Sequence, residues 1–118
     1  MSPNYSRYHH AITCALLCVC VALSILTLAS AAASKPATHT VVLRGMKNVP
    51  ATLVVKVGDT VVWKNDDVVP HTATDRGKSF DSGNIEPGGS WSYVANRKGT
   101  FSYYCAYHPN TRGRLVVR

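Results

Sequence analysis

Three side chains in the second half of the sequence bind transition metals readily: His71, Cys105 and His108. Cys105 and His108 form a Cys-x-x-His pair, whereas His71 lies far upstream in a Val-Pro-His-Thr segment. One thiolate and two imidazoles form the trigonal set that suits copper in electron transfer, because thiolate stabilises Cu(I) and imidazole accepts both Cu(I) and Cu(II). Zinc also accepts these ligands. A short Cys-x-x-His pair also arises by chance, so the spacing alone leaves an ordinary loop open as the alternative.

The first third of the chain differs in composition from the rest. Residues 11–33 contain no charge, no Pro and no Gly, and they end in Ala-Ser-Ala-Ala-Ala, while Arg7 precedes them. This pattern is typical of a secretory signal peptide. We therefore expect residues 1–33 to be a cleaved signal peptide and residues 34–118 to be an exported domain without a membrane segment. The alternative is a retained anchor, because the apolar run is long enough to span a bilayer.

The cysteine count of the expected domain favours a metal site. Cys105 is the only one of the four cysteines that lies in residues 34–118, so no intrachain disulfide can form there. Exported domains of this size have thin cores and are often stabilised by a disulfide or a metal. A lone exported thiol is also vulnerable unless it is buried or ligated. These considerations strengthen the expectation that Cys105 binds a metal.

Short β-rich segments separated by Gly and Pro turns make up the expected domain. No window has a convincing helical period, and the strongly apolar segments favour two packed sheets. The segments on either side of Gly58-Asp59 predict a strand-turn-strand unit. Alternation predicts that Phe101, Tyr103 and Cys105 share one face of a strand. The sequence therefore predicts an antiparallel, all-β sandwich or barrel with strands near residues 41–43, 53–57, 60–65, 91–94, 100–105 and 115–117.

Charge and motifs argue against catalysis and against nucleic-acid binding. The chain carries 13 Lys+Arg and 6 Asp+Glu, a net charge of +7. No nucleophile elbow, zinc-protease helix or phosphate loop is present, so we expect that the protein is not an enzyme. The basic residues are dispersed and no nucleic-acid reading motif accompanies them. Arg112 and Arg114 follow the candidate ligand His108 closely, and with this net charge they would steer an acidic protein partner toward it at low salt. The alternative is an ordinary solvated basic face. The adjacent acids Asp66 and Asp67 are expected to cap a turn.

Several different short motifs follow one another in a characteristic order, at residues 57–63, 69–72, 80–83, 87–88, 103–109 and 112–117. Together they resemble the cupredoxins, specifically the bacterial plastocyanin- and amicyanin-like group. The resemblance implies a Greek-key β-sandwich in which His71, Cys105 and His108 are the equatorial ligands of one type 1 copper ion. It also implies a monomeric, periplasmic one-electron carrier between redox proteins, with the edge of His108 as the electron port. In this family the polar residue at Thr72 often bonds across to the cysteine loop.

One position departs from the family pattern. The ligand loop of the family ends in a Met that supplies a weak axial thioether, but Thr111 stands at that place here. A hydroxyl is a harder and poorer copper donor than a thioether. Met46, the only other methionine in the expected domain, is predicted to pack in the core. Thr111 leaves a second function open, in which a periplasmic protein binds or delivers copper without redox turnover.

Overall fold

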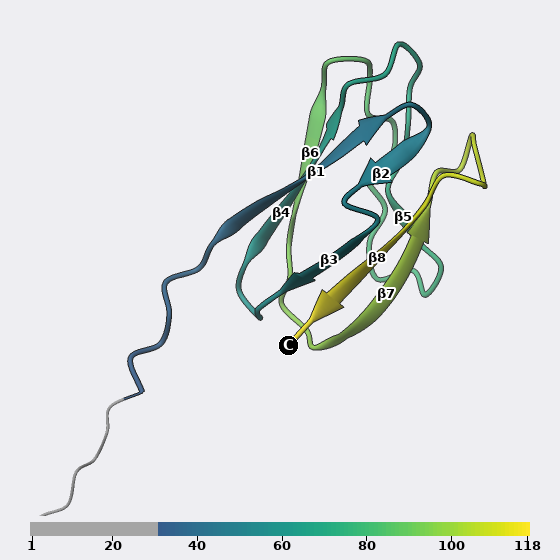
Figure 1. Cartoon of the computed structure of the whole chain (residues 1–118). Helices are drawn as coiled ribbons and strands as arrows, with labels where there is room; N and C mark the ends of the chain where they lie inside the picture. The colour runs from purple at the N-terminus through teal and green to yellow at the C-terminus, as the bar shows by residue number, and fades with distance from the viewer. Residues whose placement is uncertain (1–30) are drawn as a thin grey trace, which may run out of the picture. The chain divides into compact units, whose positions relative to one another are not determined.

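Eight β-strands and no helix make up residues 31–118, the part of the chain that the computed structural model describes (Figure 1). The expected signal peptide, residues 1–33, lies outside the described residues except for its last three. Ser34–Arg118 form one compact unit. Within the described part, no helix has the length and apolar character needed to cross a membrane.

The strands form two four-stranded sheets of a Greek-key sandwich, which confirms the predicted all-β class. The first sheet contains, in spatial order, β2 (Lys47–Val49), β1 (Thr38–Arg44), β4 (Thr60–Asn65) and β6 (Ser90–Val94). The second contains, in spatial order, β3 (Thr52–Val55), β8 (Arg112–Val117), β7 (Gly99–Tyr104) and β5 (Thr74–Asp75).

The two strands that flank Gly58-Asp59 do not pair with each other, because β3 and β4 belong to different sheets. β1 pairs in parallel with β4, and β3 pairs in parallel with β8. The prediction of a wholly antiparallel sandwich is therefore wrong. The turn carries the chain from one sheet to the other, so each strand pairs with a neighbour from a distant part of the sequence. Gly58 has a φ of 94°, a backbone conformation that favours glycine.

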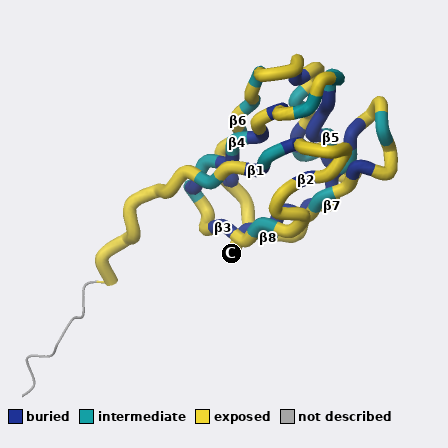
Figure 2. Tube along the Cα trace, turned by 45° about the horizontal axis from the view of Figure 1, so that its top comes forward, coloured by how far each residue is buried: buried dark blue, intermediate teal, exposed yellow. Residues whose placement is uncertain are grey.

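Alternating burial along β4 and β7 builds the core (Figure 2). Phe101, Tyr103 and Cys105 are all buried, which confirms the predicted inward face. Tyr103 packs edge-on against the fully buried Trp63, with ring centroids 5.4 Å apart. Burial raises the pKa of Tyr103 to about 12. The Tyr103 ring lies over Gly113 of β8, where an added Cβ would come within 2.2 Å of it.

Asp59 ties the start of β1 to the turn that precedes β4. Its carboxylate accepts the backbone N–H groups of Ala37 at 2.8 Å and Lys56 at 3.0 Å, and it bonds His39 Nε2 at 2.9 Å. The N–H of Ala37, then that of Lys56 and then His39 lower the pKa of Asp59 to about 2. The carboxylate therefore joins two segments at this end of the sandwich, the start of β1 and the turn before β4.

Replacing Asp59 with asparagine is expected to destabilise the domain at neutral pH, because one charged acceptor then no longer serves three donors. Because the pKa of Asp59 is lower in the folded state, its charged carboxylate stabilises the protein at pH values above 3.8, the ordinary pKa. This stabilisation is lost as the pH falls through about 2. The difference in urea midpoint between wild type and Asp59→Asn should therefore shrink over this window. A difference in urea midpoint that stays constant as the pH falls to about 2 would contradict the role assigned to the Asp59 charge.

Candidate metal centre

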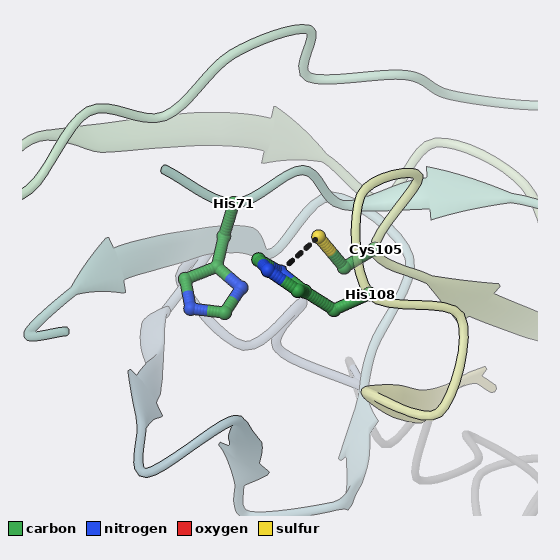
Figure 3. A group of neighbouring side chains, drawn as sticks. All are labelled: His71, Cys105 and His108. Atoms are coloured by element: carbon green, nitrogen blue, oxygen red, sulfur yellow. Dashed lines mark hydrogen bonds between the residues drawn. The ribbon is translucent and has the colours of Figure 1, made fainter. Parts of the chain in front are cut away.

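Two loops bring the three predicted ligands together (Figure 3). His71 lies between β4 and β5, where its backbone exchanges two hydrogen bonds with Ile85. Cys105 directly follows β7, and His108 lies in the loop between β7 and β8. Their donor atoms all lie within 4.8 Å of one another. Because nitrogen and sulfur ligands bind transition metals at about 2.0–2.3 Å, one ion can contact all three after small side-chain movements.

The His71 ring is held in the orientation that a metal ligand needs. His71 is fully buried, and its Nε2 lies 2.8 Å from Asp67 Oδ2. Because a carboxylate only accepts hydrogen bonds, Nε2 donates this bond, and in the neutral imidazole that leaves the lone pair on Nδ1. Nδ1 is buried and has no hydrogen-bond partner among the described residues. An unsatisfied buried polar atom costs about 1–3 kcal/mol, so this atom fits a bound metal better than an empty pocket.

Asp67 is the residue of this centre that the sequence analysis missed. Besides bonding His71, its carboxylate accepts the N–H groups of Gly45 at 2.6 Å and Met46 at 3.0 Å. Burial would raise the pKa of Asp67, but the bonds from Met46, Gly45 and His71 outweigh it and hold the pKa below the ordinary value. Asp67 therefore stays charged and fixes the His71 ring, as carboxylates beside metal-binding histidines do. The turn cap predicted for Asp66 and Asp67 comes instead from Asn65, whose Oδ1 accepts the backbone N–H of Asp67.

Cys105 is a buried thiol and forms no disulfide among residues 31–118. The backbone N–H of Thr72 points at its sulfur, with N and Sγ 3.4 Å apart. The Thr72 hydroxyl also accepts the N–H of Ala106 at 2.8 Å, which confirms the predicted bond to the cysteine loop. A sulfur that receives an N–H is better able to carry the negative charge of a thiolate. Thr72 thus joins the two ligand loops from the residue next to His71.

His108 closes the cluster on its solvent side. Its Nδ1 lies 3.6 Å from Cys105 Sγ, and its ring centroid lies 5.2 Å from that of His71 (Figure 3). The ring is partly exposed, whereas His71 and Cys105 are buried. Tyr107, next to it, is 54% exposed. The arrangement therefore offers one ligand edge to the surface and shields the other two donors from water.

Thr111 lies under the ligand loop, with its side chain turned toward the β1–β2 turn. It is 2% exposed, and its hydroxyl donates to the carbonyl of Met46 at 2.9 Å. Met46 is 41% exposed, so the prediction that it packs in the core is wrong. Gly45 and Met46 both have a φ of 60° and form the two-residue turn between β1 and β2, which turns the Met46 side chain outward. This turn contacts Thr111 through its carbonyl and Asp67 through its amides.

The fold and the donor set define a Greek-key sandwich with a His2Cys cluster held between two loops. The chain belongs to the cupredoxin-like family, whose domain model matches residues 15–117. Amicyanin of Paracoccus versutus is 32% identical over 93 residues, which cover 74% of this chain and 70% of that protein. Amicyanin of Paracoccus denitrificans is 36% identical over 77 residues, and the chain spans 59% of its length.

Similarity to solved structures supports the same assignment to the cupredoxin-like family. An amicyanin variant in its Cu(I) form is similar with a TM-score of 0.64 and 31% identity, covering 69% of this chain and 82% of that one. A purple cupredoxin from Nitrosopumilus maritimus is similar with a TM-score of 0.62 and 29% identity, covering 68% of this chain and 99% of that one. The predicted family is therefore confirmed.

Proposed function

We propose that the protein is an exported one-electron carrier in which His71, Cys105 and His108 are the equatorial ligands of one type 1 copper ion. The observation that carries the proposal is the convergence of a buried thiol and two imidazoles, one of which has a buried Nδ1 with no hydrogen-bond partner within residues 31–118. Membership of the cupredoxin-like family and similarity to amicyanins support it. In this proposal residues 1–33 are the signal peptide and residues 34–118 form a monomeric periplasmic domain that is not an enzyme.

The surrounding residues suit rapid electron exchange because they limit movement of the ligands. When bound, copper supplies the change between Cu(I) and Cu(II). Asp67 fixes the His71 ring, and the N–H of Thr72 supports the charge on Cys105. Rigid ligands keep the geometry similar in both oxidation states, so little rearrangement accompanies the electron. The partly exposed His108, with Tyr107 beside it, offers the edge at which a redox partner makes contact.

Titration of the purified protein with Cu(II), followed by visible absorption and electron paramagnetic resonance, tests this function. A redox carrier should bind one equivalent, develop an intense visible band, and lose and regain the band on reduction and reoxidation. A colourless protein that binds one Cu(I) or Zn(II) would refute the electron-carrier function.

A second function, copper binding or delivery without redox turnover, is favoured by one observation. Thr111 offers a hydroxyl where the family has a thioether, and that hydroxyl already donates to the Met46 carbonyl. Soft thioethers favour Cu(I), and the axial ligand tunes the potential of such centres. Under this alternative, copper binds with high affinity but the bound ion does not cycle reversibly.

Replacing Thr111 with methionine should move both the visible band and the midpoint potential, because the loop then regains a soft axial donor. A shift on the order of 60 mV would correspond to a tenfold change in the relative affinity for the two oxidation states. Spectroelectrochemistry measures both quantities. Thr111→Val is the matched control, since it removes the hydroxyl without adding sulfur. If the methionine variant retains copper with an unchanged band and potential, Thr111 does not occupy the axial position.

A further inference from the structure

We infer that an acidic protein partner docks on a basic hollow formed by Arg76, Arg112 and Arg114 on the outer face of the second sheet. The inference rests on the proposed electron-carrier function and adds to it a partner class and a docking surface. The hollow has a volume of about 480 Å³, and all three arginines line it together with Ser102. It lies outside the cluster of metal-binding side chains, on the face opposite the core.

Strand register explains why the arginines gather there. Phe101 and Tyr103 of β7 point into the core, so Ser102 and Tyr104 point outward. Arg114 pairs with Ser102 and Arg112 pairs with Tyr104 across the strands. The hollow therefore spans β8 and β7, which lie side by side in the second sheet (Figure 1).

Arg76 extends the hollow past the end of β5. Its backbone N–H donates to the carbonyl of Ser102 at 2.9 Å. Its guanidinium lies 4.6 Å from the centroid of the Tyr104 ring. Stacking on an aromatic face holds an arginine in place while its N–H groups remain available to an incoming carboxylate. Two sequentially distant arginines, Arg76 and Arg114, thus border one surface.

The positive charge of this hollow is not neutralised from within the domain. Among residues 31–118, none of the three guanidinium groups forms a salt bridge. Asp75 is buried and accepts the N–H of Ser79. Asp81, the exposed acid near this face, accepts from the Thr74 hydroxyl and from the N–H of Gly83. Three uncompensated guanidinium groups match clustered carboxylates, which arginine binds with two parallel hydrogen bonds.

The hollow also lies close to the loop that carries the predicted ligands Cys105 and His108. Tyr104, on whose ring Arg76 stacks, immediately precedes Cys105 in the sequence. Arg112 Nε donates to the carbonyl of Pro109, which follows His108. An acidic partner held on the arginines would therefore lie beside the loop that carries two of the three predicted ligands.

The test maps the binding of an oligoglutamate peptide to the isotope-labelled protein by amide chemical shifts, in the Cu(I) form and without metal. Shifts should cluster at Arg76, Ser102, Tyr104 and Arg114, and binding should weaken as salt screens the charges. Arg76→Glu with Arg114→Glu should weaken binding by about tenfold at low salt. Arg112 is left unchanged because it contacts the ligand loop.

The matched control is Lys56→Glu with Lys98→Glu, which changes the net charge equally at exposed positions beyond the far ends of β3 and β7. It should weaken binding by about twofold or less. An equal loss in both double variants would overturn the docking surface in favour of unspecific attraction. Saturation of the same amides by inorganic phosphate or citrate at lower concentration than the peptide would overturn it in favour of a small-anion site.

Failure of the docking proposal is distinguishable from failure of the proposed function. If peptide binding is unspecific but the reversible visible band is present, the docking surface is wrong and the carrier function stands. If the band is absent while the peptide binds to the hollow with the expected variant effects, the carrier function is wrong.

Discussion

Replacing Cys105 with serine should abolish the intense visible band of the copper-loaded protein rather than shift it. The band of such centres arises from charge transfer between thiolate sulfur and Cu(II), and a serine hydroxyl stays protonated and is a hard donor. The structure makes the variant a clean test, because Cys105 is fully buried and forms no disulfide within the part of the chain that the structure describes. Serine is nearly the same size, so the fold should persist. Visible absorption after Cu(II) addition measures the effect, and circular dichroism checks folding.

Two histidine variants provide a matched control for this result. His71→Gln should weaken copper binding and alter any remaining band, because it removes the buried Nδ1. His39→Gln should leave the band unchanged, because His39 bonds Asp59 and lies outside the cluster. A band that survives Cys105→Ser would remove Cys105 from the site. A band that responds equally to both histidine variants would mean that the assigned ligand set is wrong.

Replacing Gly113 with alanine should destabilise the domain by about 3 kcal/mol, the upper part of the range for overpacked cores. The added Cβ would lie 2.2 Å from the Tyr103 ring and 2.3 Å from its hydroxyl oxygen. Tyr103 cannot move easily, because it also packs edge-on against Trp63. For a domain of this size the loss corresponds to a fall in Tm of about 12–24 °C. Thermal unfolding followed by circular dichroism measures it.

Gly88→Ala separates this clash from the general effect of replacing a glycine. Gly88 has a φ of 78° and no atom within 4 Å of an added Cβ, so only backbone strain opposes the change. We expect it to cost about 1 kcal/mol. Shortening Tyr103 to leucine in the Gly113→Ala background should recover part of the loss, since the two residues face each other across β7 and β8. Equal Tm values for Gly88→Ala and Gly113→Ala would contradict the register of these strands.

Most of the candidate centre could be predicted because its donors are rare residue types. The Cys-x-x-His spacing, together with the single cysteine of residues 34–118, indicated Cys105 and His108 as candidate ligands. Asp67 could not be recognised in the same way, since acids next to turns are common. The sequence signal that could have pointed to Asp67 is its position four residues before His71. Only the fold shows that its carboxylate reaches both His71 and the turn at Gly45.

The strand pairing was the least predictable part of the fold. The alternation of residue types along the strand correctly predicted which face of β7 is buried, because side-chain direction depends on local backbone geometry. The two-residue strand β5 and the three-residue strand β2 are too short for a period to be detected. The turn at Gly58-Asp59 indicated a reversal but not the sheet that each flanking strand joins. That choice depends on pairing between β1 and β4 and between β3 and β8.

The sequence by itself determined the kind of chemistry available, the all-β class and the face of β7 that is buried, because donor types, turn residues and alternation are local properties. The tertiary structure decided the distances and the surroundings. It brought His71 to within 4.8 Å of the other two donors, turned Met46 outward and gathered Arg76 and Arg114 on one surface. These features join segments far apart in the chain, and contacts of that kind depend on how the sheets pair and pack.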